Sequence, residues 1–500
     1  MGQRQIREIF RAILTFNQQN GVSYRHGMQF IYEEGAMASR VDQKNQVGEQ
    51  TALLKVFAGT TQHYWGNWGS IFSGVGDPRN PWQITYPLDS LLFTGAFLFI
   101  CQLGSRRGIK DRLRGNYSSQ AKFKAWFGTE NIPHGDTLNY SFQRLVVEEV
   151  QEVICRNVEI LIRKKVLYRY RLLDVYYLIA IDGTGVLTFR ERHCPHCLTK
   201  TFKSGKTIYY HPVLEAKLVT SNGFAFSLMT EFIENTDLSA DKQDCELKAF
   251  YRLATRLKKR FPRLPLCLLL DGLYAGGPTF QVCNNYDWKY LIVLREDDLP
   301  NLHRSFAVAI AQLPNQRKQV ELNEVNFQQR TEQVKQEYRW AEDLLYTDSQ
   351  DHTHRLGLIE CQESRIDTQG QSQAIHYKWV TNFSLTAHNV DRLANRGGRL
   401  RWKIENEGFN VQKNSDLNLE HPYSQDPIAR KVFYLLLQLA CIIFQLMRHG
   451  SLLLQAFPDG LRTAKNLAFR LLEAWRNLSL SPEEMLALPN GSYQIRFDTS

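Results

Sequence analysis

The chain has 500 residues, of which 43% are hydrophobic and 12% aromatic, so it carries enough apolar side chains to build several cores and is not a disordered protein. Lysine and arginine number 61 against 51 aspartates and glutamates, which gives a formal net charge of +10. This composition excludes collagen-like and coiled-coil chains. A large folded chain with a basic balance indicates a polyanionic partner, most often a nucleic acid.

We expect no segment of this chain to cross a membrane. Near the N-terminus, Arg7, Glu8 and Arg11 interrupt the apolar residues, unlike the core of a secretory signal. The apolar runs Leu91–Cys101 and Val432–Met447 are shorter than the roughly 20 residues that a spanning helix needs, so both are predicted to be buried helices. The nine cysteines are mostly scattered singly, which is typical of a reducing compartment and predicts a cytoplasmic protein.

The first clear pattern along the chain is helical. Residues 1–85 show no clear pattern, whereas from Pro87 to about residue 172 hydrophobic residues recur at helix spacing. This block carries a basic stretch that includes Arg106, Arg107 and Lys110. We predict that it binds DNA; the alternative is a solvated helical face.

From residue 175 the pattern changes to short strands separated by helices. The predicted elements are strands at 175–182, 211–220 and 223–233, a helix at 244–262, a strand at 266–271, a helix through Phe280 and a strand at 290–294. The residues Ser221 to Gly223 predict a hairpin turn. A mixed sheet covered by helices accounts for this order, so the predicted fold class is α/β.

The remaining chain divides into an insertion and a return to helices. Residues 296–390 are polar and rich in glutamine at first and strand-like later, and helical character returns at Val390. We divide the chain into 1–85 without a clear pattern, 86–172 helical and DNA-binding, 173–295 the first part of the sheet domain, 296–390 a β-rich insertion, 391–450 the second part of the sheet domain, and 451–500 a C-terminal helical segment and tail.

Two aspartates stand at the ends of predicted strands, Asp182 after the first and Asp271 after the fourth. If these strands are neighbours, both carboxylates emerge at one edge of the sheet, where sites of open α/β sheets lie. Such oxygen ligands suit Mg²⁺, and paired ions can activate water and stabilise the leaving oxygen of a phosphodiester. Each aspartate could instead only cap a strand or open a turn. Asp244 and Glu246 are expected to be N-terminal helix charges rather than further acids of this site.

A third carboxylate is expected on a helix further along the chain. Arg401 and Glu405 are four residues apart and share one helix face. Glu405 can complete a carboxylate triad while Arg401 contacts a phosphate; the alternative is a surface ion pair. Glu407 competes for the same role. Residues two positions apart on an α-helix point about 200° from each other, so only one of these glutamates can face the metals. We predict that it is Glu405.

These motifs resemble those of DDE transposases of bacterial insertion sequences, in the branch marked by Tyr-x2-Arg-x3-Glu-x6-Lys. The resemblance is carried by IAIDGTG around Asp182, LCLLLDGLYAGG around Asp271 and RWKIENEGFNVQKN around Glu405. It implies an RNase H-like catalytic core interrupted by a β-strand insertion, in which these three acids are the catalytic ligands of Mg²⁺ or Mn²⁺. It also implies that Arg401 and Lys413 contact the transposon end.

The chain departs from that branch at two points. Gly398 stands at the signature tyrosine, and seven residues rather than six separate Glu405 from Lys413. The resemblance implies a transposase that hydrolyses a phosphodiester at transposon ends and transfers the freed 3′ hydroxyl into target DNA. Its partners would be terminal inverted repeats, target DNA and a second copy of the chain, in a bacterial cytoplasm. The competing functions are an RNase H-like nuclease without strand transfer and an inactive DNA-binding relative.

A second candidate site lies between the first two predicted strands. His193, Cys194, His196 and Cys197 stand close together, and His211 begins the next strand. A Cys-x2-Cys pair is half of a structural zinc site, which needs four ligands. Cys194, Cys197 and His211 with either His193 or His196 would supply them; the alternatives are a loop of free thiols and a transient redox pair.

Overall fold

The computed structural model describes residues 25–236, 242–325, 331–366, 372–461, 463–491 and 493–497. The residues on which the absence of a secretory signal was predicted, Arg7, Glu8 and Arg11, lie outside these ranges.

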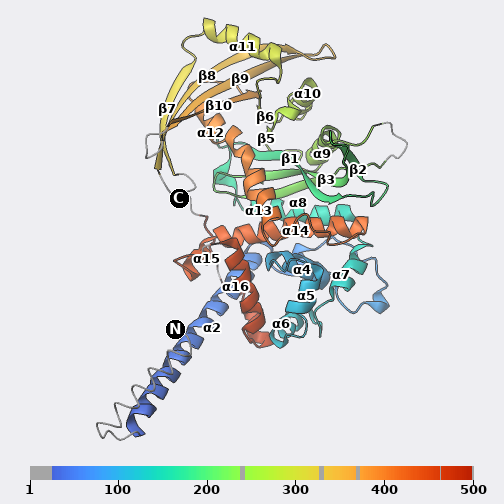
Figure 1. Ribbon diagram of the computed structural model, residues 1–500, viewed down its shortest axis with the longest axis vertical. Helices are drawn as coiled ribbons and strands as arrows, with labels where there is room; N and C mark the ends of the chain where they lie inside the picture. Colours follow the sequence, from blue (N-terminus) through green and yellow to red (C-terminus); the bar gives the residue numbers. More distant parts are fainter. Residues whose placement is uncertain are drawn as a thin grey trace.

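One mixed sheet forms the centre of the described chain (Figure 1). Its strands are β1 Tyr177–Phe189, β2 Leu198–Thr201, β3 Thr207–Val219, β4 Ala225–Phe232, β5 Leu266–Leu270, β6 Lys289–Val293, β7 Arg317–Val325, β8 Thr331–Thr347, β9 Thr353–Ile366 and β10 Ser372–Thr381. They are ordered β2-β3-β1-β5-β6-β10-β9-β8-β7, and β4 pairs with β3 beyond the stretch that β2 occupies. The predicted α/β class is confirmed.

The strands β1, β3, β4, β5 and β6 have an arrangement consistent with an RNase H-like sheet. β1, β3 and β4 are antiparallel neighbours, whereas β5 and β6 run parallel to β1. The turn between β3 and β4 is short, and Gly223 adopts a φ of 96° there, a conformation that suits glycine. The parallel strands need longer crossovers, which α9 Glu246–Arg260 and α10 Gly277–Asn285 supply.

The insertion extends the central sheet. β10 pairs antiparallel with β6, and β9, β8 and β7 continue the sheet outward, at the top of Figure 1. The predicted β-rich character is confirmed, but the insertion also contains a helix that was not predicted, α11 Pro300–Gln312. Its buried Leu302, Phe306 and Ile310 recur every four residues, which is a helical signal within a region judged as a whole to be β-rich.

Helices surround the lower half of the sheet and continue below it. Before the sheet lie α2 Arg25–Trp65, α3 Trp68–Ile71, α4 Leu88–Ile100, α5 Arg106–Arg112, α6 Tyr117–Phe127, α7 Gly135–Phe142 and α8 Val147–Arg163. After the insertion come α12 Val390–Asn395, α13 Asn410–Asn414, α14 Pro427–His449, α15 Ser451–Ala456, α16 Ala464–Asn477 and α17 Pro482–Ala487. Short turns of other helical types lie at Pro81–Gln83, Tyr168–Tyr170, Gly272–Tyr274, Gly398–Trp402 and Ile404–Phe409.

The helix α2 corrects the reading of residues 1–85 as a region without a clear pattern. In its final turns Leu53, Leu54 and Phe57 are buried, whereas residues 45–49 are exposed. Among the residues of this helix whose burial is described, the buried apolar positions therefore lie toward its C-terminal end.

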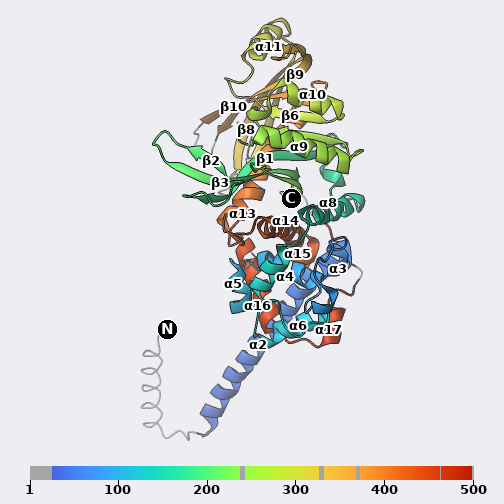
Figure 2. The same cartoon turned by 90° about the vertical axis from the view of Figure 1, so that its right-hand side faces the viewer.

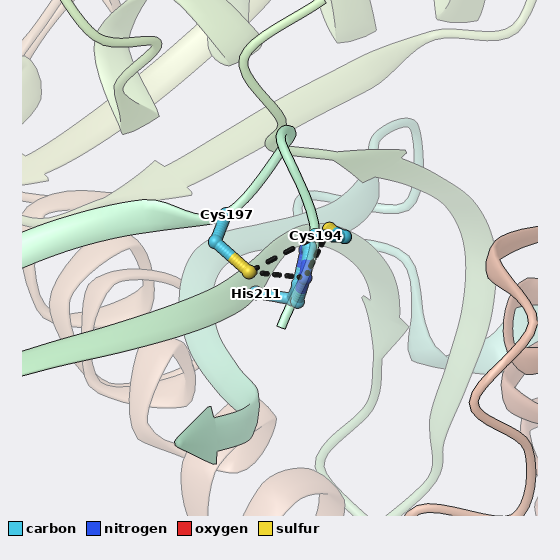
Figure 3. Close-up of side chains that lie close together, drawn as sticks. All are labelled: Cys194, Cys197 and His211. Atoms are coloured by element: carbon cyan, nitrogen blue, oxygen red, sulfur yellow. Dashed lines mark hydrogen bonds between the residues drawn. The ribbon is translucent and has the colours of Figure 1, made fainter. Parts of the chain in front are cut away.

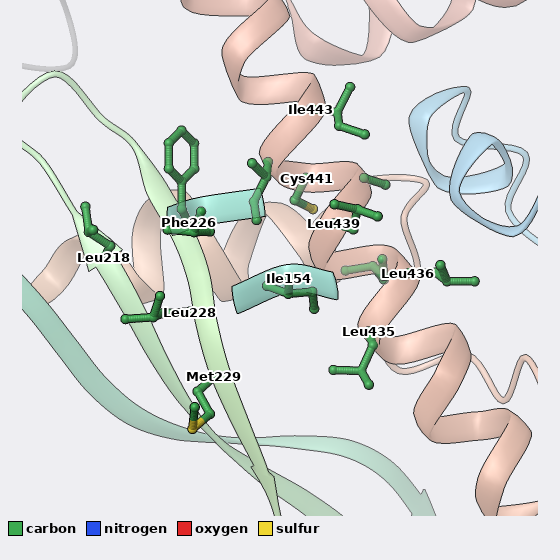
Figure 4. Close-up of a cluster of buried hydrophobic side chains, with 14 of the residues drawn as sticks. Ile154, Leu218, Phe226, Leu228, Met229, Leu435, Leu436, Leu439, Cys441 and Ile443 are labelled. Atoms are coloured by element: carbon green, nitrogen blue, oxygen red, sulfur yellow. The ribbon is translucent and has the colours of Figure 1, made fainter. Parts of the chain in front are cut away.

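The helix α14 forms the centre of the apolar core. It packs against α4, α8 and β4, and Figure 4 shows Ile154 of α8 between Leu435 and Leu439 of α14 on one side and Phe226 and Leu228 of β4 on the other. Within the described residues it is the one helix long and apolar enough to cross a membrane, but 78% of its most apolar window is buried inside the protein. The prediction of a buried helix here is confirmed, and the chain is consistent with a protein that does not span a membrane.

Candidate functional site

Parallel pairing of β1 and β5 brings Asp182 and Asp271 to the same level of the sheet. Ala180 pairs with Leu269, so each aspartate lies two residues further along its chain. β5 ends at Leu270, and the Asp271 carboxylate then accepts a hydrogen bond from the backbone of Leu273 at 2.9 Å. Both carboxylates therefore lie where β5 ends, at the edge predicted for a site.

The sequence predicted that Asp182 ends its strand, and this prediction is wrong. β1 continues to Phe189, and this extension pairs with β3, from Asp182 opposite Glu215 to Phe189 opposite Tyr209. The strand continues past its apolar run because β3 is long enough to form hydrogen bonds with the backbone of the added residues. Asp271 does open a turn, as the alternative prediction for this residue had it. A functional test is needed to distinguish this role from metal binding.

A further acid, Glu246, lies beside Asp182. It is the first residue of α9, and a Cβ atom added at Gly183 would lie 2.4 Å from Glu246 Oε2, so this side chain rests against the backbone next to Asp182. The Tyr274 hydroxyl donates to Glu246 Oε1 at 2.6 Å. The expectation that Glu246 is only a charge at a helix start missed this proximity.

The negative charges of Asp182, Glu246 and Asp271 repel one another, which disfavours ionisation of Asp182. Burial raises the pKa of Asp182 to about 6; the Arg401 guanidinium counters this, and the charges of Glu246 and Asp271 raise the pKa further. Burial also raises the pKa of Glu246, against the hydrogen bond from Tyr274. Acids that are costly to ionise together are the kind of oxygen donor that a divalent cation stabilises. Among the described residues, however, no three of these acids bring their carboxylate oxygens within 4.8 Å of one another.

Arg401 lies between the acids and a basic cavity. It is buried, and its guanidinium Nη1 is 3.4 Å from Asp182 Oδ2, while its Nε has no hydrogen-bond partner among the described residues. A cavity of about 360 Å³ adjoins it. Its lining includes Asp271, Arg295, Lys378, Arg399, Arg401 and Trp402. In the protein alone Arg401 therefore pairs with an acid. The cavity also contains Glu296, and two of its cations are paired, Arg399 with Glu363 and Lys378 with Glu360, so a phosphate would compete with carboxylates for them.

Glu405 and Glu407 lie in the π-helical turn Ile404–Phe409 and not in the regular α-helix that was expected. The chain packs closely on both sides of this turn. A Cβ atom at Gly398 would lie 2.4 Å from Trp379 Nε1, and one at Gly408 would lie 3.2 Å from the Lys217 side chain. The Trp379 ring thus occupies the space beside the position at which the signature has a tyrosine. π-Helical turns are frequent at functional sites.

The two glutamates have different surroundings. Glu407 Oε1 pairs with Lys403 Nζ at 3.1 Å, and the residue lines a hollow with Gly223 and His449 at the end of α14. Glu405 is half-buried, and its carboxylate forms no ion pair or hydrogen bond with the part of the chain that is described. The carboxylates of Asp182, Asp271 and Glu405 do not approach to within 4.8 Å as a set of three, so the structure does not assemble the predicted triad.

The predicted DNA-contacting residues lie in two places. α5 is among the N-terminal helices, across α14 from the sheet in both views (Figures 1 and 2). Arg107 and Lys110 on it are exposed, whereas Arg106 donates to the carbonyl of Gly135 at 3.2 Å. Lys413 lies on α13 and pairs with Glu420 at 3.0 Å. Their contacts with DNA stay predictions.

The second candidate site is brought together in part. Cys194, Cys197 and His211 form the one set of three possible ligands within 4.8 Å that the described residues contain. His193 and His196 are not members of it. The loop before β3 also contains the strand β2, which was not predicted. Only four residues of β2 pair with β3, so its pattern in the sequence is short.

Comparison with known proteins bears on the N-terminal helices. Residues 70–157, from α3 to α8, match a family model described as DDE_Tnp_1-associated. No curated protein matches the chain. The match covers the helical region that precedes the sheet and not the strands that carry Asp182 and Asp271. This region is therefore similar to a domain associated with DDE-type transposases.

Proposed function

We propose that this chain is a DNA transposase of an insertion sequence. It would hydrolyse a phosphodiester at each end of its element and direct the freed 3′ hydroxyl at target DNA. The observation that carries the proposal is the position of Asp182 and Asp271, which lie at the same height on neighbouring parallel strands of an RNase H-like sheet. The match of residues 70–157 to a transposase-associated family and the order of the sequence motifs support it.

Asp182, Asp271 and Glu405 are the proposed ligands of Mg²⁺ or Mn²⁺, and Glu246 is a further acid beside them. Such ions, when bound, activate water and stabilise the leaving oxygen of a phosphodiester. Asp182 and Asp271 hold fixed carboxylates at the sheet edge, and Glu246 is oriented by the hydroxyl of Tyr274. Arg401 neutralises Asp182 in the free protein and lies at a cavity where a DNA phosphate would compete with carboxylates for the cations.

The proposed partners are DNA and a second copy of the chain. Arg106, Arg107 and Lys110 on α5 would contact the terminal inverted repeats, together with Arg401 and Lys413. Two element ends must be cut together, so a homodimer on DNA is proposed, acting in the bacterial cytoplasm. The exposure of Arg107 and Lys110 and the net charge of +10 support contact with a polyanion.

A plasmid that carries the DNA flanking the coding region at both ends tests this function. We expect Mg²⁺-dependent strand cleavage and joining by the purified chain. Asp182→Asn and Asp271→Asn should abolish cleavage and retain DNA binding, because a lost metal ligand removes transition-state stabilisation but few phosphate contacts. Asp174→Asn, at an exposed aspartate before β1, is the matched control.

The outcomes separate the alternatives. Cleavage without joining would identify a nuclease. Binding of the flanking DNA without any cleavage would identify an inactive relative. Near-normal cleavage by Asp182→Asn or Asp271→Asn would overturn the assignment of the site.

A further inference from the structure

Cys194, Cys197 and His211 form a cluster that the proposed transposition chemistry does not use (Figure 3). The two Sγ atoms are 3.5 Å apart, and His211 Nε2 lies 3.4 Å from Cys194 Sγ and 3.2 Å from Cys197 Sγ. Ligands of a tetrahedral zinc ion, with Zn–S near 2.3 Å and Zn–N near 2.1 Å, are about 3.6–3.8 Å from one another. The three atoms are thus within a few tenths of an ångström of the spacing around one ion.

The ring of His211 lies between this cluster and a neighbouring acid. The residue is 4% exposed and its Nδ1 has no hydrogen-bond partner among the described residues, while Nε2 faces the two sulfurs. Glu234 Oε1 lies 3.8 Å from Nδ1, and Glu234 itself pairs with Arg430 at 3.1 Å and Lys431 at 2.6 Å. A carboxylate behind a histidine is the usual support of a metal-binding imidazole, and here α14 holds that carboxylate in place.

Asn235 fixes the cysteine loop from its other side. Its side chain donates to the carbonyl of Cys197 at 3.1 Å, and its own carbonyl accepts from the His196 ring at 2.8 Å. His196 is therefore engaged away from the sulfurs. Within the described residues His193 has no such contact and stacks on Phe189 with ring centroids 4.6 Å apart. Its nitrogens are therefore unpaired there, although they lie outside the 4.8 Å set and would have to approach it to bind the same ion.

We propose that Cys194, Cys197 and His211 bind a structural Zn²⁺ ion, with His193 as the fourth ligand. The ion would fix the base of the β2–β3 hairpin to the sheet. That hairpin projects from the sheet in Figure 2, and beyond its base Lys200, Phe202, Lys203 and Lys206 are exposed. A two-stranded hairpin without a core of its own is marginally stable in water, so a metal at its base would supply the missing order.

Metal analysis of the purified full-length protein tests the proposal. We expect about one equivalent of zinc, lost in Cys194→Ser and His211→Ala. Cys245→Ser is the matched control, because Cys245 is exposed and outside the cluster, and it should retain the zinc. Removing the metal with a chelator should lower the unfolding temperature of the wild-type protein, and added zinc should restore it.

A second measurement decides the case even if Cys194→Ser does not fold. Replacement of zinc by Co²⁺ in the wild-type protein should give the charge-transfer absorption of two thiolates bound to a tetrahedral ion. No zinc in protein prepared with zinc supplied, no such absorption, or a Cys194–Cys197 disulfide found by mass spectrometry would each overturn the proposal. None of these readouts uses DNA cleavage, so their failure is distinct from failure of the proposed function.

The fourth ligand is tested separately. His193→Ala should weaken zinc binding at least tenfold in competition with a chelator, whereas His196→Ala should retain the affinity because its ring bonds to Asn235. An unchanged affinity in His193→Ala would overturn the assignment of His193.

Discussion

Burial and charge conflict at Asp182. Its carboxylate accepts from the backbone of Gly183 at 2.9 Å and faces Arg401, but burial together with Glu246 and Asp271 raises its pKa to about 6. An aspartate in an unfolded chain loses its proton near pH 3.9. Between these values the folded protein holds a proton that the unfolded chain releases, so the free energy of unfolding falls as the pH rises from about 4 to about 6.

Asp182→Asn should remove this dependence on pH. Without divalent metal, the variant is expected to be more stable than the wild type at pH 7 by up to about 3 kcal/mol, which is the free energy of a shift of about two pKa units. Urea unfolding at a series of pH values in the presence of a chelator measures this. Asp459→Asn, at an exposed aspartate, serves as the control. The same pH profile in wild type and Asp182→Asn would contradict the argument.

Glu246→Gln should lower DNA cleavage at least tenfold, which corresponds to about 1.4 kcal/mol of transition-state stabilisation. Glu246 accepts from Tyr274 and lies against Gly183, so its charge acts directly beside Asp182. Asp244, two residues earlier, pairs instead with Arg252 at 2.7 Å, and Asp244→Asn should keep nearly full activity. Rates of cleavage at fixed DNA occupancy compare the two variants; equal loss in both would indicate a structural role only.

Glu405→Gln should abolish cleavage, and Glu407→Gln should remain active. Glu407 already pairs with Lys403 and faces the hollow at His449, whereas the carboxylate of Glu405 has no protein partner among the described residues. The same plasmid assay separates them. An inactive Glu407→Gln together with an active Glu405→Gln would reverse the assignment.

At the scale of elements, β3 and α14 are joined by a buried polar network. Glu215 and Lys217 of β3 are both fully buried, with 3.5 Å between Lys217 Nζ and Glu215 Oε2. Lys217 donates to Gln438 of α14 at 2.6 Å, and Glu215 accepts from Tyr434 of α14 and from Ser227 and Thr230 of β4. Removing one member of such a pair leaves a buried charge without its counter-charge.

Lys217→Met should lower the free energy of unfolding by about 3–5 kcal/mol. The double variant Lys217→Met with Glu215→Gln should be less destabilised than Lys217→Met alone, because the neutral amide still accepts from the β4 hydroxyls. Lys200→Met, at an exposed lysine of β2, is the control. Denaturant unfolding of the three variants checks this, and a double variant less stable than Lys217→Met would contradict it.

At the scale of the whole molecule, helices from the N-terminal and C-terminal parts of the described chain pack together below the sheet. α16 packs against α2 and α6, and α17 against α6, on the side of α14 away from the sheet (Figure 2). Trp475 of α16 is fully buried in an aromatic cluster with Phe97 of α4 at 4.7 Å and Trp126 of α6 at 5.3 Å between ring centroids. The C-terminal segment therefore completes the core of the N-terminal helices.

Trp475→Ala should lower the free energy of unfolding by about 3–5 kcal/mol, since it leaves a cavity between helices from the N-terminal and C-terminal parts of the described chain. Trp82→Ala is the matched control, because Trp82 is 94% exposed and its loss should have little effect. Thermal or denaturant unfolding measures both. A loss confined to the C-terminal segment, with the N-terminal helices still folded, would contradict the single core.

The sequence by itself determined the elements whose signal is local. The strands that became β3, β4, β5 and β6 follow from short apolar runs, and the turn at Gly223 follows from its residues. The apolar run Val432–Met447 predicted a buried helix, although α14 extends beyond that run and is long and apolar enough to cross a membrane. These features depend on neighbours in the chain, so periodicity and turn chemistry are enough to predict them.

Only the tertiary structure shows the features that depend on contacts between residues far apart in the chain. Glu246 reaches Asp182 because α9 begins against Gly183, and the insertion joins the sheet because β10 pairs with β6. The π-helical turn around Glu405 lies against Lys217 of β3 at Gly408, a contact that no local pattern reveals. Contacts between residues distant in the chain arise from the whole energy of packing. The sequence could therefore name Asp182 and Asp271 and their shared edge, but not the position of Glu246 or the separation of Glu405 from the two aspartates.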